Sequence, residues 1–137
     1  MRGRIGEIDV PVSWVHGDFK TDNIMTSVDR AVGIDTGANF ENVILLDLSH
    51  FLNQLELSLF DPRSIRMLPK RQTLVDRFKG GYGGFTESEE MCLTWFRLLA
   101  AIRLWAEHQC QEKSILHRYD NLRYRYLVRS LIRDLQR

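Results

Sequence analysis

Short apolar runs separated by polar turns make up residues 12–37, and this stretch constrains the fold more than any other part of the chain. The runs Val12–Val15, Asn23–Met25 and Ala31–Ile34 are too short for helices, and polar, turn-forming residues bound them, which is typical of strands. Residues 27–30, SVDR, form a turn-like group between the second and third runs. We therefore predict a short β-hairpin region here.

Polar side chains in this stretch follow a recognisable spacing. Residues 16–23, HGDFKTDN, fit the pattern H-x-D-x-K-x-x-N, and Asp35-Thr36-Gly37 then supplies D-x-G. Because the strands close a polar loop and the third strand ends in a carboxylate, we expect Asp18, Asn23 and Asp35 to lie at one edge. Either match alone is weak, and their order and close spacing make the joint pattern strong.

The residue types suit transfer of a phosphoryl group from ATP, which needs a positioned nucleophile and cations that spread the developing charge. Asp18 can accept or orient the proton of a substrate hydroxyl. In an extended segment Lys20 projects from the same side and can neutralise the transferred group. Asn23 and Asp35 offer the oxygen ligands that Mg²⁺ prefers. The sequence therefore predicts Asp18 and Lys20 as catalytic residues, and Asn23 and Asp35 as ligands of Mg²⁺.

Two further residues are predicted to support the site. His16 is expected to fix the loop by hydrogen bonding, because Asp18 already serves as the base. Asp47 has three possible roles: a third metal ligand, a brace for the loop, or the cap of a helix that starts around Leu48. We favour the cap or the brace. Asp22 and Asp29 are expected to be turn residues that face solvent.

The remainder of the chain has the periodicity of helices. We predict a helix from about Leu48 to Phe60, which Asp61-Pro62 ends, and a short one over residues 73–78. Thr86 and Glu89 form a capping box for a helix that runs to about Gln109, and a last helix covers about 114–135. The glycines of residues 80–84 could suggest a phosphate-binding loop, but no strand precedes them, so they indicate a helix end.

Apolar spacing predicts which helix faces are buried. On the helix over 86–109 the expected inner face comprises Met91, Trp95, Leu98, Leu99, Ile102 and Trp105. On the last helix it comprises Ile115, Tyr119, Leu122, Tyr126, Leu131, Ile132 and Leu135. The other face of that helix carries a row of arginines, which we expect to be solvated rather than to bind an anion: Arg118, Arg123, Arg125, Arg129 and Arg133.

Length and composition set the wider frame. A chain of 137 residues with 44% hydrophobic residues is sized for one domain, with catalytic and metal-binding loops in 12–37 and a helical scaffold in 47–137. The formal charge of +1 argues against nucleic acid or an anionic membrane as a partner. Cys92 and Cys110 lack metal-site or disulfide spacing, so reduced thiols are expected. The N-terminal residues carry no signal-peptide pattern, and we expect a cytoplasmic protein.

Three segments together resemble a known family: HGDFKTDN, GID at residues 33–35, and LLDLSHFL at residues 45–52. They are similar to the C-terminal part of the aminoglycoside phosphotransferase and choline kinase-like group, within the protein-kinase-like fold. The resemblance implies an α+β, mainly α-helical C-terminal lobe, in which a short β-hairpin catalytic region precedes about four helices. It implies Asp18 as base, Asn23 and Asp35 on Mg²⁺, and Asp47 in a segment that opens a helix under the site.

The resemblance also implies a function and an expectation about completeness. Thr36-Gly37 stands where many small-molecule kinases have Trp or Phe and then an acid. Lys20 stands at a position where its presence is similar to the catalytic loop of protein kinases. The acceptor is therefore left open, with the hydroxyl of an aminoglycoside or amino alcohol as examples. Thirteen residues precede Trp14, so we expect the nucleotide-binding N-terminal lobe to lie outside this chain and turnover to be low without it. The alternative is a non-catalytic, kinase-like interaction module, possibly homo-oligomeric.

Overall fold

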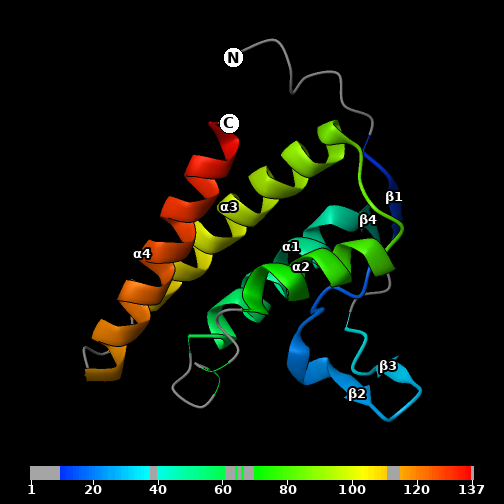
Figure 1. The fold of residues 1–137 in the computed structure, drawn as a ribbon, viewed down its shortest axis with the longest axis horizontal. Helices are drawn as coiled ribbons and strands as arrows, with labels where there is room; N and C mark the ends of the chain where they lie inside the picture. Colours follow the sequence, from blue (N-terminus) through cyan, green and yellow to red (C-terminus); the bar gives the residue numbers. More distant parts are fainter. Residues whose placement is uncertain are drawn as a thin grey trace.

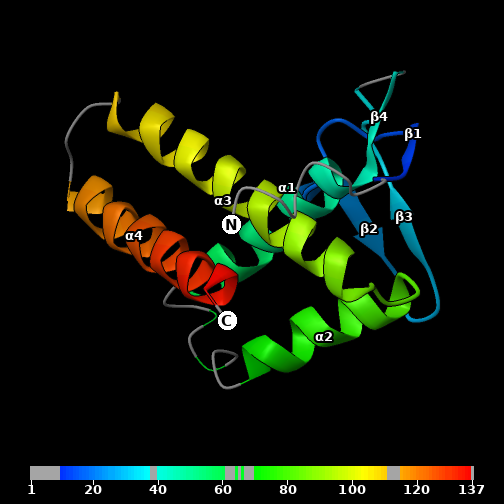
Figure 2. The same ribbon diagram turned by 90° about the horizontal axis from the view of Figure 1, so that it is seen from above.

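The computed structural model describes residues 10–37, 40–60, 64, 66, 70–110 and 115–136. Within them the chain is mainly helical, and four short strands lie at one end of the helices (Figures 1 and 2). This agrees with the predicted α+β, mainly α-helical class. The elements are β1 (Val12–Trp14), a 3₁₀ turn η1 (Thr21–Asn23), β2 (Ile24–Thr26), β3 (Ala31–Gly33), β4 (Glu41–Val43), α1 (Ile44–Ser58), α2 (Arg71–Gly81), α3 (Glu87–Gln109) and α4 (Ile115–Leu135).

The strands form two antiparallel pairs. β2 and β3 make the predicted hairpin, with Ile24 opposite Gly33. β1 pairs instead with β4, with Val12 opposite Val43. Sequence analysis did not predict β4, because its residues, ENV, carry no strand pattern of their own. The three predicted strands are each within one residue of their observed bounds.

The start of α1 corrects one prediction. The helix begins at Ile44, directly after β4, and the residue before it is Val43, whose side chain offers no hydrogen-bond acceptor. Asp47 lies within the first turn of α1, so its predicted role as the cap of a helix near Leu48 is wrong. The helix ends at Ser58, close to the predicted position, whereas residues 61–62 lie outside the described residues.

The helix ends around residues 80–86 follow local chemistry. α2 is longer than the predicted 73–78 and runs into the glycines before it ends. Gly83 and Gly84 then adopt φ values of 110° and 80°, which are favourable for glycine. The predicted capping box of α3 is confirmed: the Thr86 hydroxyl accepts from the Glu89 N–H, and the Glu89 carboxylate accepts from the Thr86 N–H. This backbone hydrogen bond, together with one from the Thr86 hydroxyl, lowers the pKa of Glu89.

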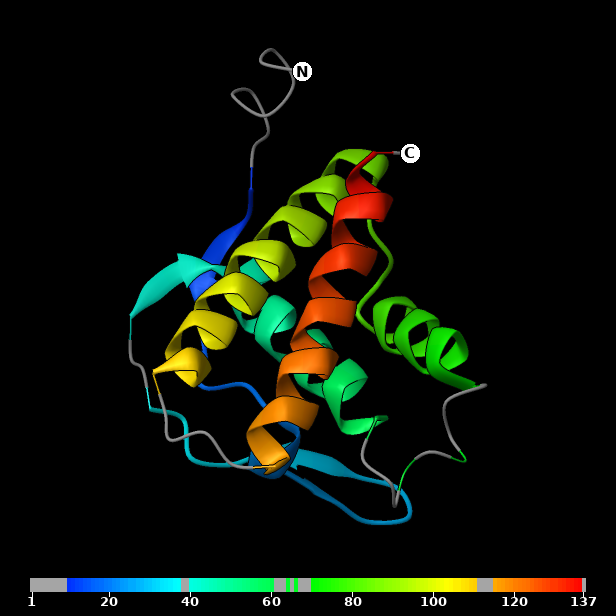
Figure 3. The same ribbon diagram turned by 90° about the vertical axis from the view of Figure 1, so that its left-hand side faces the viewer.

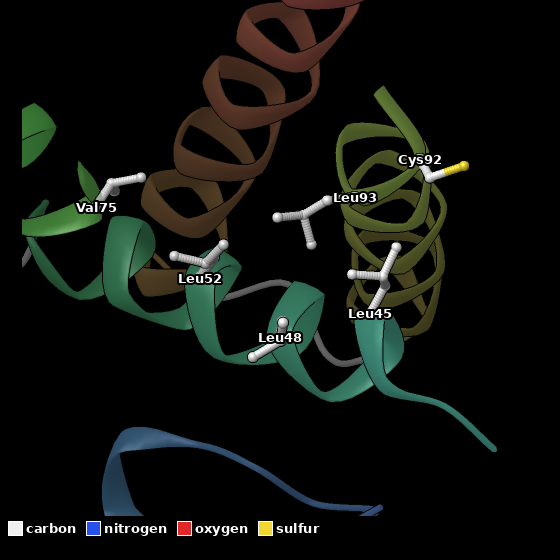
Figure 4. Packing of buried hydrophobic residues seen from close by; sticks show 6 residues of the cluster. All are labelled: Leu45, Leu48, Leu52, Val75, Cys92 and Leu93. Carbon is white, nitrogen blue, oxygen red and sulfur yellow. The ribbon is translucent and has the colours of Figure 1, made fainter. Parts of the chain in front are cut away.

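Two hydrophobic clusters hold the helices together. In the first, leucines of α1 pack against α2 and α3, and Figure 4 shows Leu93 pointing toward α1; its buried residues are Leu45, Leu48, Leu52, Val75, Cys92 and Leu93. The second joins the antiparallel helices α3 and α4, which lie side by side in Figures 2 and 3. Its buried residues are Leu57, Leu98, Ala101, Leu127, Val128 and Leu131.

The buried face of α3 differs from the predicted one. Trp95, Leu99 and Ile102 are 37%, 59% and 46% exposed, whereas Leu98 is buried as predicted. The fully buried positions of α3 also include the small residue Ala101 and the charged residue Arg97. A count of large apolar residues recognises that face only in part, because a small side chain and a paired cation share it with Leu93 and Leu98.

The face of α4 is also corrected. Tyr119, Leu122, Tyr126 and Ile132 are exposed, and the buried strip consists of His117, Leu127, Val128 and Leu131, of which Leu131 was predicted. Arg118, Arg125, Arg129 and Arg133 are exposed, as expected of a solvated row. Arg123 is not part of this row, because it donates to the Asp120 carboxylate and to the Leu57 carbonyl. The side chain of Ile115 lies outside the described residues.

A charged network links the helices inside the scaffold. Glu56 of α1 accepts from Arg97 of α3 over 2.7 Å and also from Arg71 of α2. Asn53 accepts from Arg97 Nε at 3.1 Å and donates to the Arg97 carbonyl at 2.8 Å. Arg71 donates in turn to the Tyr126 hydroxyl of α4 at 3.0 Å. Sequence analysis did not predict this network, which ties all four helices to one carboxylate.

Two sequence-based expectations concern the chain as a whole. Cys92 is buried and Cys110 exposed, and both thiols are free, as predicted. Burial raises the pKa of Cys92. Within the described ranges, none of the helices combines the length and apolar character needed to cross a membrane.

Candidate functional site

Asp47 holds the start of the predicted catalytic loop. Its two carboxylate oxygens accept from the backbone N–H groups of His16 and Gly17, at 2.5 and 3.0 Å. Gly17 has φ of 81°, a conformation that favours glycine and turns the chain after β1. Because Asp47 belongs to the first turn of α1, the loop is fixed to the helical scaffold. This is the brace role that the sequence left open beside the cap.

His16 joins the loop to the end of the hairpin. Its Nε2 lies 2.9 Å from the carbonyl oxygen of Ile34, the residue before Asp35. The ring also rests against Gly33, where an added Cβ would lie 3.7 Å from His16 Cδ2. The side chain therefore bridges two segments that carry predicted site residues, in line with the supporting role expected for it.

Asp18, Lys20 and Asn23 lie together. Lys20 Nζ donates to Asp18 Oδ2 at 2.5 Å, and the Asn23 amide nitrogen donates to the same oxygen at 3.2 Å and to the Asp18 carbonyl at 3.0 Å. The side chains of Asp18 and Lys20 are 53% and 32% exposed, whereas Asn23 is buried. Asn23 uses its side-chain amide nitrogen in these bonds, so its side-chain oxygen, Oδ1, is the atom that could hold a cation.

The electrostatics of the pair follow from this contact. The hydrogen bond from Lys20, with smaller help from its charge and from Asn23, lowers the pKa of Asp18. The hydrogen bond to Asp18 raises the pKa of Lys20, and the charges of Asp22 and Asp35 raise it further. At neutral pH Asp18 is therefore a carboxylate and Lys20 a cation, the charge states that the predicted roles require.

Asp35 lies at the open end of the hairpin beside Asn23. The Ile34 N–H donates to the backbone carbonyl of Asn23 at 2.9 Å, which places the residue before β2 next to the residue after β3. Asp35 has φ of 58° and is the sole non-glycine residue with a positive φ among the described residues. Such a conformation is costly and is often found where function requires it. Asp35 is exposed, so its carboxylate faces solvent together with the Asp18–Lys20 pair.

The residues present fit a magnesium ion that takes few protein ligands. In the described part of the chain, no three His, Cys, Asp or Glu side chains gather closely enough to hold a metal. Asn23 and Asp35 would supply two hard oxygens, and Mg²⁺ commonly completes its six positions with water and phosphate oxygens.

Two aromatic residues near the site were missed by sequence reasoning. Phe19 lies between Asp18 and Lys20 in the chain and packs toward α1. Tyr82, in the glycine-containing turn after α2, is close enough to Asp47 that the carboxylate charge, after burial, raises its pKa. The sequence did contain a signal for Phe19, because an aromatic residue between two charged ones in an extended segment points to the opposite side. It contained none for Tyr82, which is 39 residues from the nearest strand along the chain.

No family model, curated protein or solved structure matched this chain in comparisons with known proteins.

Proposed function

We propose that residues 12–37 are the catalytic and metal-binding part of an ATP- and Mg²⁺-dependent phosphotransferase, in a lobe that corresponds to the C-terminal lobe of the protein-kinase-like fold. The acceptor in this proposal is a hydroxyl of a small molecule, such as an aminoglycoside or an amino alcohol. The observation that carries it is the contact of Asp18 with both Lys20 and Asn23, beside Asp35 and braced by Asp47. Asp18, Lys20, Asn23 and Asp35 are among the residues that the H-x-D-x-K-x-x-N and D-x-G patterns single out.

Each residue has a defined task in this reaction. Asp18 orients the acceptor hydroxyl and receives its proton as the hydroxyl oxygen bonds to the γ-phosphorus and the bond to the leaving ADP oxygen breaks. Lys20 is held beside Asp18 and faces the negative charge of the transferred group. Asn23 and Asp35 would hold Mg²⁺, which when bound supplies positive charge to the phosphate oxygens.

The exposed apolar side chains of the strands around the site are a reason to propose a second lobe. Val12, Trp14, Met25 and Val32 are 60%, 66%, 62% and 55% exposed, so the strands present apolar side chains to solvent. Exposed apolar clusters commonly mark surfaces that another body covers. In our proposal a nucleotide-binding lobe covers these strands and holds the nucleotide from the other side. The chain described here would then bind Mg-ATP weakly by itself.

Isothermal titration calorimetry with Mg-ATP tests the proposed metal site. The wild-type chain is expected to release or absorb heat in a Mg²⁺-dependent manner, and Asp35→Ala is expected to lose that dependence. Asp29→Ala is the matched control, because Asp29 is an exposed hairpin-turn carboxylate that accepts from the Ser27 hydroxyl at 3.1 Å. Equal heats for wild type and Asp35→Ala, or heat from neither, would contradict a working metal site.

The exposed strands also favour a second candidate function. In it the chain is a non-catalytic, kinase-like interaction module, and the same apolar side chains form an interface with a partner or a second copy. Sedimentation velocity over a range of protein concentrations tests the second-copy form. Self-association that Trp14→Ser abolishes would support it, and a monomer at every concentration would count against it.

A further inference from the structure

Phe19 is turned in the opposite direction to the two charged residues that flank it. Lys20 has an extended backbone, with φ of −143° and ψ of 164°. Side chains alternate in direction along an extended segment. Asp18 and Lys20 meet each other at the surface, whereas Phe19 is half-buried and stacks on Phe51 of α1. The ring is thus the inward anchor of a segment whose charged side chains face outward.

The stack continues beyond α1. The ring centroids of Phe19 and Phe51 are 4.9 Å apart, those of Phe51 and Phe78 are 4.4 Å apart, and the planes in each pair differ by 27°. Phe51 is buried in α1, and Phe78 lies on the last turns of α2. Three rings therefore run in continuous contact from the loop, across one helix, to a second helix. The His16 ring adds a tilted contact with Phe19 at 5.7 Å.

The other anchors of the loop are hydrogen bonds to its backbone. Asp47 holds the N–H groups of His16 and Gly17, and Asn23 holds the Asp18 carbonyl. Phe19 is the anchor that lies between the two predicted catalytic side chains. A displacement of the ring that shifts the Phe19 backbone moves Asp18 and Lys20 as well, because each is joined to Phe19 by a peptide bond.

We propose that Phe19 is a positioning residue for the Asp18–Lys20 pair and that α2 sets its place through the Phe78–Phe51–Phe19 stack. The catalytic meaning of this inference rests on the proposed phosphotransferase function, whereas the mechanical coupling does not. α2 thereby becomes part of the site, although none of its residues reaches the predicted reacting atoms. Displacements of about 1 Å at a reacting group can change rates roughly 100-fold, so a shift of α2 would regulate the pair.

The test compares two variants of α2 by heteronuclear NMR. Phe78→Leu removes the outer ring of the stack but keeps an apolar side chain, and Val75→Ala removes buried volume from the same helix while leaving all three rings in place. The readout is the ¹³Cα and amide ¹⁵N shifts of Asp18, Phe19 and Lys20, which report on the backbone. We expect Phe78→Leu to move these shifts and Val75→Ala to leave them near the wild-type values.

Two further variants keep the test decisive. Phe19→Leu acts from the other end of the stack and should move the same loop shifts, and Phe78→Tyr retains the ring and should restore them. Equal loop changes in Phe78→Leu and Val75→Ala, or loop changes in Phe19→Leu alone, would overturn the coupling.

Titration of the same samples with Mg-ATP separates this inference from the proposed function. If Mg-ATP leaves the wild-type loop shifts unchanged, the proposed function fails, while the difference between Phe78→Leu and Val75→Ala still decides the coupling.

Discussion

Two clusters in this molecule contain the same three kinds of side chain in opposite surroundings. At the candidate site a carboxylate, a cationic side chain and an amide meet, in Asp18, Lys20 and Asn23. The side chain of Asp18 is 53% exposed and that of Lys20 is 32% exposed. Between the helices Glu56, Arg97 and Asn53 meet where the charged side chains are 6% and 7% exposed. The buried set is committed to its mutual hydrogen bonds, whereas the exposed Asp18–Lys20 pair can exchange its contacts for those of a ligand.

This difference in burial distinguishes structural from functional charges. Breaking a buried pair of a carboxylate and an arginine strongly destabilises the protein. Such a pair is also out of reach of a substrate. An exposed pair contributes little to stability, because water screens it. Residue type cannot distinguish the two clusters, and burial can.

The largest expected effect is the loss of one buried partner. Glu56→Gln removes the charge that Arg97 and Arg71 share, and the free energy of unfolding should fall by about 3–5 kcal/mol, since arginine is left buried without a counter-charge. Urea unfolding followed by circular dichroism measures this. Glu56→Leu combined with Arg97→Met serves as the control and should recover much of the loss. A small effect of Glu56→Gln would mean that water reaches the network. The two clusters would then not differ in their surroundings as described.

A second prediction separates the observed helix face from the apolar pattern of the sequence. Leu93→Ala should lower the free energy of unfolding by about 2–5 kcal/mol, because Leu93 is fully buried in the first cluster. Leu99→Ala on the same helix should change it by less than about 0.5 kcal/mol, because Leu99 is 59% exposed. Thermal unfolding of both variants provides the measurement. Similar losses for the two would indicate that another chain or segment covers the exposed face of α3.

The smallest predicted effect concerns the titration of Asp18. Its folded-state pKa lies below the ordinary value, so the small stability it contributes is present above that ordinary value and is lost as pH falls through the lowered pKa. Lys20→Met removes the main cause and should raise the pKa of Asp18 toward its ordinary range. NMR titration of the Asp18 side-chain carbonyl carbon follows the midpoint in both proteins. An unchanged midpoint would show that Lys20 and Asp18 are apart in solution.

The sequence was most informative where local chemistry determines structure. The hairpin, the capping box of Thr86 and Glu89, and the last two helices follow from neighbours along the chain, and the observed bounds agree closely. The start of α1 was placed too late because Asp47 was expected to act on its own helix. It binds the N–H groups of His16 and Gly17 instead, about 30 residues earlier in the chain.

What the sequence could not predict depends on contacts between distant segments. β4 exists because it pairs with β1, and Arg97 is buried because Glu56 meets it from another helix. For the site, the grouping of Asp18, Lys20 and Asn23 could be expected from spacing. The inward direction of Phe19 and the approach of Tyr82 to Asp47 could not, because both depend on how α1 and α2 pack.

Paramagnetic NMR with Mn²⁺ in place of Mg²⁺ tests the central claim most directly. Mn²⁺ takes oxygen ligands and broadens resonances close to it. Substoichiometric Mn²⁺ in the presence of ATP is expected to broaden the Asn23 side-chain amide and the backbone amide of Asp35 first. Asp35→Ala is expected to remove this broadening. Broadening that centres on other carboxylates, such as those of Asp120 or Glu87, or that persists in Asp35→Ala, would contradict a phosphotransfer site in residues 12–37.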